Sequence, residues 1–590
     1  MVMNIHAKVS LRLFKKHKIR LLTILCIVFI SISFMFGILE VENKIATATN
    51  NIYDQQNISD IYIKSKNMMG FTLQEKLIIN DKFKNDSVLE SLCYEFIEND
   101  EIKRVYSYDL KTNVNKLEVI EGRLPNKVNE VVVERKTSSI KKVNIGETVK
   151  INNIDFEVVG IVFNPFIIIE IEEFSFINSE DNVDYIIYMN NANNLMINDI
   201  YISLSDRTLF NNFSMNYENY IKNLKIELKN ELGDNVEILS LFENYGLYSL
   251  NSYAEKVSTI GIIFVVFFLL ITLLVVFSTM SRLFEEERAQ IACLKTLGYS
   301  NFVIVQKYIW FVVIGIVLGS FFAYNTGLLL TKMLYNGFNL QYHMPKMPKQ
   351  VNIFNYFTML GILLFSIVIL MYITSMKEVN KNPVQLLTPK APKKGKKVLL
   401  EKIPFVWNRL SFKYKSTVRN VFLFKSRFLM TVVSIIGATV LVFAGMALMD
   451  CTAKMENAEL LYTISLALIL FSGFLCALVI YNITNINISE RTREIATLMV
   501  LGYQDKEVSG YIYREIYIMS AIGAVLGIPV GYIFIDYVFM MIDFGKISDI
   551  NWWTWILAPI ITMIFSFLST LLLYKKIIKV DMNASLKSLE

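Results

Sequence analysis

The sequence predicts an α-helical membrane protein with eight transmembrane helices in two four-helix repeats, plus one α+β extracytoplasmic domain between the first and second spans. Three observations lead to this fold class. Of 590 residues, 54% are hydrophobic and only 19% are charged. Eight uncharged stretches are long enough to cross a bilayer, which takes about 20 apolar residues. Two charged segments in different halves of the chain also repeat each other.

The eight uncharged stretches are too long and too numerous for the buried helices of a soluble protein. They are Leu21–Leu39, Ser258–Met280, Tyr308–Thr331, Phe354–Met376, Phe428–Met449, Leu460–Ile483, Ile516–Ile535 and Trp552–Tyr574. The first stretch is about twice the length of a signal-peptide core, and no small-x-small cleavage site follows it. We therefore expect an uncleaved first span.

Lysine and arginine predict the orientation of the spans. Residues 1–20 carry six basic side chains and no acid, and residues 375–427 carry fourteen basic side chains against two acids. Residues 41–255 instead carry 21 basic and 34 acidic side chains. Because basic loops stay in the cytoplasm, we expect both termini and the basic linker there. The acidic segment is then expected outside a bacterial plasma membrane.

Internal duplication is the second argument for the fold. The entries to the first and fifth spans read "LRLFKKHKIRLL" and "VRNVFLFKSRFL". After the second and sixth spans the chain reads "EEERAQIACLKTLGYSN" from residue 285 and "ERTREIATLMVLGYQDKEV" from residue 490. A shift of 204 residues aligns Ile291 with Ile495 and Gly298 with Gly502. The two halves therefore form two units of four spans each.

Both charged segments have the pattern of short amphipathic helices. In residues 490–503 apolar side chains recur at three- and four-residue steps, which leaves Glu490, Arg491 and Glu494 on another face. A glycine follows each segment, where it can adopt the left-handed conformation that ends a helix. One such segment would be a solvated connector, but two in register favour helices that dock into a groove of a soluble partner.

At these residues the chain resembles the FtsX-like permease family, the membrane subunits of type VII ABC systems of the MacB and LolC/LolE kind. The family pattern, Glu-Arg-x-x-Glu-Ile-x-x-Leu-x-x-Leu-Gly-Ala/Tyr, is complete in the second segment, whereas Gln290 replaces the second acid in the first. The segments "EGRLPNKVNEVVV" (121–133), "IGETVKI" (145–151) and "FEVVGIV" (156–162) look like the β-rich periplasmic core domain of MacB-type proteins. The resemblance covers nearly the whole chain.

The resemblance implies that both segments are coupling helices, the helices through which a permease contacts its ATPase. The residues that it assigns to this contact are Glu286, Ile291, Leu294, Leu297, Gly298, Tyr299, Glu490, Arg491, Glu494, Ile495, Leu498, Leu501, Gly502 and Tyr503. The chain contains no G-x-x-x-x-G-K-[ST] phosphate loop. We therefore expect no cofactor on this chain, and ATP bound by a separate, dimeric ABC ATPase.

Other classes of function have less support. The chain has three histidines, too few for a histidine-based metal cluster or triad, and neither H-E-x-x-H nor G-x-S-x-G occurs. Acids between residues 170 and 184 do not have the spacing of a calcium loop, so we expect a solvated acidic face. We expect no catalytic residue, no bound metal and no nucleic acid. The expected partners are the ATPase, the lipid bilayer and either a second copy of this chain or a related permease.

The extracytoplasmic segment is expected to fold on its own. Alternating residues around Asn152-Asn153 predict a hairpin. The spacing of Tyr217, Ile221 and Leu228 predicts a helix stopped by Gly233. A second helix is expected from Leu89 to Ile97. Residues 41–56 and 240–257 are expected to continue the first and second spans as helical stalks. Cys93 is the only cysteine in this segment, so no internal disulfide is expected.

The expected boundaries are 1–20 for a cytoplasmic amphipathic segment, 21–39 for the first span, 40–257 for the extracytoplasmic domain with its stalks, 258–376 for spans two to four with coupling helix 285–299, 377–427 for the basic cytoplasmic linker, 428–574 for spans five to eight with coupling helix 490–503, and 575–590 for the cytoplasmic tail. The expected function is transmission of ATPase motion to the outer domain, for export or extraction of a hydrophobic, peptide-like or lipid-like substrate. A regulator of a cell-wall enzyme without substrate passage, and a receptor or scaffold without an ATPase, remain alternatives. The sequence leaves the substrate and the direction of transport open.

Overall fold

A computed structural model describes residues 12–67, 69–169, 174–177, 181–190, 196–210, 213–388, 401, 404–409, 411–423, 425–454 and 459–578. The expectations for residues 1–11, for the lysine run 391–397, for most of the acidic run 170–180 and for the end of the tail lie outside these residues. The chain forms two compact units. The membrane unit comprises residues 1–41, 257–334 and 352–590, and the sheet unit comprises residues 42–256 and 335–351.

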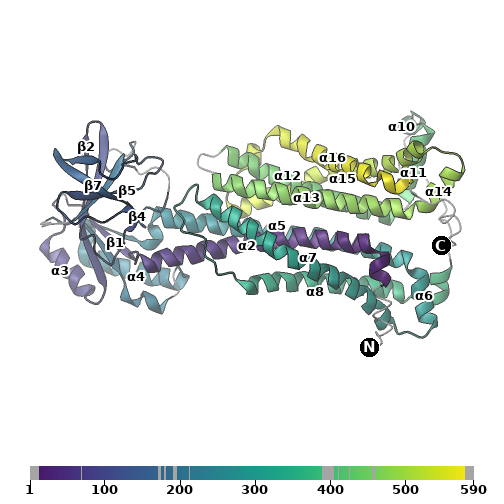
Figure 1. Cartoon of the computed structure of the whole chain (residues 1–590), viewed down its shortest axis with the longest axis horizontal. Coiled ribbons are helices and arrows are strands. Elements are labelled where there is room, and N and C mark those ends of the chain that lie inside the picture. Colours follow the sequence, from purple (N-terminus) through teal and green to yellow (C-terminus); the bar gives the residue numbers. More distant parts are fainter. Residues whose placement is uncertain are drawn as a thin grey trace. The chain divides into compact units, whose positions relative to one another are not determined.

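Eight helices among the described residues are long and apolar enough to cross a membrane (Figure 1). They are α2 (Lys18–Gln55), α5 (Tyr245–Glu286), α7 (Asn301–Phe338), α8 (Ile353–Val379), α12 (Lys425–Ala453), α13 (Glu459–Glu490), α15 (Asp505–Ile542) and α16 (Trp552–Ile578). Five short helices connect or precede them: α6 (Arg288–Thr296), α9 (Pro383–Leu387), α10 (Pro404–Arg409), α11 (Phe412–Leu423) and α14 (Thr492–Val500). Each of the eight predicted spans falls within one of the long helices.

Glycines let the long helices approach closely at equivalent places in the two halves. A Cβ atom on Gly319 of α7 would lie 2.7 Å from the carbonyl oxygen of Leu25 in α2. A Cβ atom on Gly523 of α15, 204 residues after Gly319, would lie 2.8 Å from the Cβ of Ile435 in α12. These are the close helix contacts that small residues permit in membranes. The third helix of each half therefore packs against the first.

The sheet unit contains a ten-stranded mixed sheet in the described part of the chain, with the order β10-β1-β9-β2-β3-β8-β5-β7-β4 and with β6 paired to β7. The strands are β1 (Ile61–Ser65), β2 (Ser87–Glu98), β3 (Glu101–Tyr108), β4 (Glu118–Gly122), β5 (Glu130–Glu134), β6 (Thr148–Ile151), β7 (Ile154–Phe163), β8 (Tyr185–Asn190), β9 (Asp199–Ser203) and β10 (Val236–Ser240). The pairs β3–β8 and β5–β7 are parallel, and the other pairs are antiparallel.

Helices α3 (Leu73–Lys82) and α4 (Met215–Leu232) cover the part of the sheet formed by β1, β9 and β10. Ile79 of α3 and Ile221 of α4 are buried in one apolar cluster with Ile63 and Ile200 of the strands. This packing buries the apolar stripe of α4 that the sequence predicts.

The local predictions for this unit have mixed outcomes. The hairpin around Asn152-Asn153 is confirmed, because β6 pairs with β7 and both asparagines have positive φ, as a tight hairpin turn requires. The helix stop at Gly233 is confirmed by its φ of 74°. The helix expected from Leu89 to Ile97 is wrong, since these residues form strand β2. Burial alternates along β2 through Leu89, Ser91 and Cys93, and its pairing with β3 and β9 decides the conformation of a short apolar run.

In the segment "EGRLPNKVNEVVV", the Glu130 carboxylate holds the turn between β4 and β5. The Arg123 guanidinium donates two hydrogen bonds to Glu130, from Nη1 at 2.7 Å and Nη2 at 2.9 Å. The backbone N–H groups of Asn126 and Lys127 donate to the same carboxylate. Gly122 precedes the turn with a φ of 79°. The Arg123 hydrogen bonds and these amides lower the pKa of Glu130 to about 2.

The loop between α7 and α8 belongs to the sheet unit, which the sequence analysis did not predict. The backbone N–H of His343 donates to the carbonyl of Ile168 at 2.7 Å, and Tyr342 forms a β-bridge with Ile169. Lys44, in the stalk part of α2, donates to the carbonyl of Pro348 at 3.0 Å. The sheet unit therefore includes this loop as well as the end of α2 and the start of α5.

Candidate functional site

A single residue separates each predicted coupling helix from the long helix that precedes it. Helix α5 ends at Glu286 and α6 begins at Arg288, while α13 ends at Glu490 and α14 begins at Thr492. The residues in between, Glu287 and Arg491, are the N-cap residues of α6 and α14. Their carbonyls accept the first hydrogen bonds of the short helices, from Ile291 and Ile495 at 2.9 and 2.8 Å. Each short helix therefore follows a long helix with a single N-cap residue between them.

The Leu-Gly-Tyr sequence ends both helices in the same way. The Tyr299 N–H donates to the Leu294 carbonyl, and the Gly298 N–H donates to that of Lys295. The same two bonds recur in the second copy, from Tyr503 and Gly502. Gly298 and Gly502 have φ values of 84° and 90°, so the predicted left-handed caps are confirmed. These bonds define the Schellman motif.

The apolar side chains assigned to ATPase contact divide into three groups by burial. Ile291 and Ile495 are buried inside the membrane unit, where Ile495 packs with α15 and α16. Leu294, Leu498 and Tyr299 are half-buried. By contrast, Leu297, Leu501 and Tyr503 are 73%, 70% and 50% exposed. The exposed residues at the ends of the helices can meet a partner, whereas the two isoleucines fasten the helices to their own bundle.

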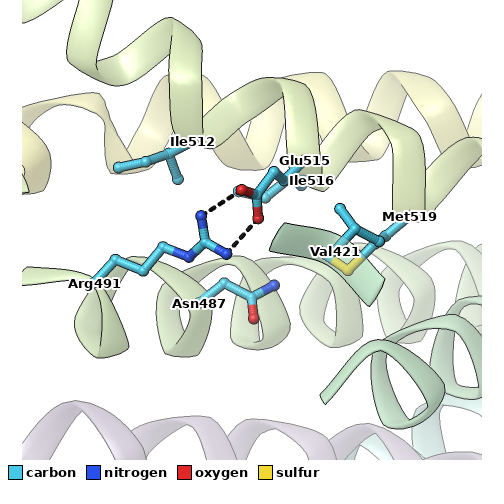
Figure 2. A pocket seen from close by; sticks show the side chains of 7 residues that line it. All are labelled: Val421, Asn487, Arg491, Ile512, Glu515, Ile516 and Met519. Atoms are coloured by element: carbon cyan, nitrogen blue, oxygen red, sulfur yellow. Dashed lines mark hydrogen bonds and ion pairs between the residues drawn. The ribbon is translucent and has the colours of Figure 1, made fainter. Parts of the chain in front are cut away.

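Arg491 is not on the exposed polar face where the sequence analysis placed it. Its side chain is 4% exposed and lies against Glu515 of α15, which is 3% exposed. Figure 2 shows the guanidinium aligned with this carboxylate, with Nη1 donating to Oε1 at 2.6 Å and Nη2 paired with Oε2. Glu494, which is 53% exposed, remains on the outer face. The pair fixes the start of α14 to α15, so Arg491 is unavailable to a partner.

The N-cap residue of α6 in the first half is also buried and ion-paired. It is an acid, Glu287, where the second half has the base Arg491. The Glu287 side chain is 0% exposed and accepts a hydrogen bond from Lys16 Nζ at 2.8 Å. His17 Nε2 lies 2.9 Å from the same oxygen, and Lys307 Nζ of α7 lies 3.9 Å from the other. Burial alone would raise the pKa of Glu287, but these hydrogen bonds and the nearby ammonium groups lower it to about 2.

Neighbouring contacts hold α6 at the end of the bundle. Glu286 pairs with Arg20 at the start of α2, so this acid is already engaged within the chain. Lys295 donates to the carbonyls of Val379 and Lys381 at 2.7 and 2.8 Å, which ties α6 to the end of α8. The side chain of Glu490 is outside the described part of the structure.

A cavity of about 410 Å³ separates α6 from the chain that precedes the first span. The residues that line it are Arg12, Leu13, Lys16, Glu287, Ala289, Gln290, Cys293, Leu294 and Lys307. The pocket around the Arg491–Glu515 pair, at the N-cap of α14, has a volume of only about 10 Å³ (Figure 2). The two coupling helices therefore have the same backbone and different surroundings.

Within the described residues no group of three or more His, Cys, Asp or Glu side chains could hold a metal ion. The five cysteines are free.

Eight apolar helices, a separate sheet unit and two equivalent capped helices at the ends of long helices define a multi-pass membrane protein. A comparison with family models shows what the chain resembles. The model of the FtsX-like permease C-terminal domain matches residues 262–383 and again residues 466–582, so the resemblance to FtsX-like ABC permeases is confirmed. Both matches include a predicted coupling helix, α6 in the first and α14 in the second. Permeases of this family are non-catalytic transporter subunits that normally work with an ATPase. A search of curated proteins found no match.

Sequence reasoning missed Glu515, Lys16 and His17 as partners of the two N-caps. A signal for Glu515 was present, since an acid beside an apolar stretch needs a partner in a bilayer. Nothing in the sequence indicates which basic residue that partner is.

Proposed function

We propose that the chain is the permease subunit of an ATP-binding cassette complex in a bacterial plasma membrane. Both termini, α6 and α14 lie in the cytoplasm, and the sheet unit, which resembles the MacB core domain, lies outside. A separate dimeric ATPase binds ATP and contacts α6 and α14. Its motion is transmitted to the sheet unit, and this drives export or extraction of a hydrophobic, peptide-like or lipid-like substrate.

One observation carries the proposal. Helix α5 is continuous for 42 residues, from Tyr245 to Glu286. It begins a few residues after the last strand of the sheet and ends at the N-cap of α6. At 1.5 Å per residue such a helix is roughly 63 Å long, about twice the thickness of a bilayer core. A displacement of α6 can therefore reach the sheet unit along one uninterrupted element.

The exposed leucines provide the contact with the ATPase. Leu297 and Leu501 occupy equivalent positions next to the capping glycines, and a short helix with an exposed apolar end suits docking into a groove. Glu494 adds an exposed acid beside the second helix. The first helix has Gln290 at the equivalent position, so it lacks one charge-assisted hydrogen bond to a basic partner residue.

The test compares the affinity of the ATPase for three forms of the full chain in detergent. Leu297→Ser combined with Leu501→Ser should lower the affinity at least tenfold, because burial of two leucines is lost. Leu340→Ser is the matched control, since Leu340 is 55% exposed and follows the far end of α7. Equal affinity for all three forms would refute docking through α6 and α14. Failure of the wild-type chain to bind any ABC ATPase would favour the receptor or scaffold alternative.

A regulator that moves a cell-wall enzyme without substrate passage is the second candidate. It is favoured by the interior of the described bundle, where buried polar contacts join small side chains, such as Ser31 with Thr272 and Ser520 with Ser566. Such contacts hold helices together and provide no charged path for a solute. A reconstituted complex that hydrolyses ATP but releases no labelled lipid or peptide would support this candidate.

A further inference from the structure

We propose that the 410 Å³ cavity beside α6 binds the phosphate headgroup of an anionic glycerophospholipid, at one site per chain. The cavity lies where the chain meets the membrane surface. Lys16 precedes the first predicted span by five residues, and Lys307 directly precedes the third. Basic pockets at this level between transmembrane helices are typical of sites for anionic headgroups.

The lining has the charge that such a ligand requires. Arg12, Lys16 and Lys307 supply three cationic groups, against the single carboxylate of Glu287. Arg12 is exposed at the rim and Lys16 is 56% exposed, whereas the Lys307 side chain is 8% exposed and lies at the floor. Guanidinium and ammonium groups at different depths can contact different oxygens of one phosphate.

A buried acceptor at the floor remains unused. Glu287 Oε2 is buried and makes no hydrogen bond to any described residue, and Lys307 Nζ is 3.9 Å away. A buried carboxylate oxygen without a donor costs free energy. A phosphate alone would leave it unsatisfied, whereas a glycerol headgroup also brings hydroxyl donors. Phosphatidylglycerol therefore matches both the cations at the rim and the acceptor at the floor.

The second half explains why one site per chain is expected. Counting 204 residues back from Glu515 leads to Phe311, which stacks on Phe14 at 5.4 Å between ring centroids. The first half thus has the aromatic pair Phe14–Phe311 where the second half has Glu515. The N-cap acid of the first half, Glu287, is paired with Lys16 and Lys307 of the cavity wall. At the N-cap of α14 the cation is instead neutralised by Glu515, and the pocket beside this pair has about 10 Å³, space for no more than one water molecule.

Cys293 is a reporter within the cavity. It lines the wall and is exposed, whereas Cys93, Cys451 and Cys476 are buried and Cys26 is half-buried. The experiment measures the rate at which an uncharged maleimide modifies Cys293 in the delipidated full chain. Mixed micelles contain either phosphatidylglycerol or phosphatidylcholine. Phosphatidylglycerol should slow the modification at least fivefold relative to phosphatidylcholine.

Two variants make the result specific. Arg12→Glu should abolish the protection, and Lys15→Glu should retain it, since Lys15 is exposed one helical turn away and does not line the cavity. In a Cys293→Ser chain, Thr497→Cys places the reporter at the equivalent position of α14, where both lipids should give the same rate.

Three results would overturn the proposal. Equal rates in both lipids, or equal loss of protection in Arg12→Glu and Lys15→Glu, would show that no headgroup site exists here. Protection by inorganic phosphate equal to that by phosphatidylglycerol would assign the cavity to a soluble phosphate compound. Protection by the ATPase but by neither lipid would assign it to the protein interface.

Discussion

Replacing one member of the Arg491–Glu515 pair should destabilise the membrane unit far more than replacing both. Arg491→Met leaves a buried carboxylate without its cation, and Glu515→Leu leaves a buried guanidinium. Each side chain is at most 4% exposed. Breaking a buried pair in this way costs about 3–5 kcal/mol, whereas replacing both charges with apolar side chains of similar volume is often neutral or stabilising. For residues 425–578, the half of the membrane unit that holds the pair, each single change should lower the Tm by roughly 6–20 °C.

Tryptophan fluorescence during thermal unfolding in detergent measures this effect, because Trp552 and Trp553 lie in α16 of the same half. The double variant should unfold within a few degrees of the wild type. Arg419→Met is the control, since Arg419 in the same unit is 61% exposed in its pair with Glu401 and such surface pairs contribute about 0–1 kcal/mol. A double variant as unstable as either single variant would refute a closed, buried pair at the start of α14.

Three further predictions concern the caps, the sheet unit and α5. Gly298→Ala and Gly502→Ala should each lower stability by about 1–2 kcal/mol in thermal unfolding, because both positions have φ near 90°, where alanine is strained. The loss should stay in this range because no neighbouring atom would clash with the new Cβ. Glu130 has a lowered pKa, so its contribution to stability is complete above pH 4.5 and is lost as the pH falls through about 2. Residues 42–256 should therefore lose Tm between pH 5 and pH 2, and Glu130→Gln should lose less over the same range. Inserting two glycines after Lys256 in α5 should leave ATPase binding intact and abolish nucleotide-dependent changes in the sheet unit; unchanged responses would show that α5 does not transmit motion.

Features set by local sequence were predictable. The long helices follow from uninterrupted apolar stretches, and the two caps follow from glycine after an amphipathic segment. The hairpin at Asn152-Asn153 follows from two residues that tolerate positive φ. In each case the residues that decide the conformation are neighbours in the chain.

Features that depend on partners distant in the sequence could not be predicted. Arg491 looks like a solvated residue of a polar face, and only Glu515, on another helix, makes its burial possible. Strand β2 was mistaken for a helix because Leu89, Leu92 and Phe96 recur at helical spacing, whereas its pairing with β3 and β9 makes it a strand. The loop at Tyr342 contains no signal for the backbone bonds that it makes with Ile168 and Ile169.

The most direct test of the central claim is photo-crosslinking in native membranes. A photoreactive residue replaces Leu297 in α6, Leu501 in α14 or Leu340 beyond the far end of α7, and the crosslinked products are identified by mass spectrometry. The account predicts that positions 297 and 501 crosslink to a protein with an ATP-binding phosphate loop and that position 340 does not. Crosslinks to lipid alone at both 297 and 501 would contradict it.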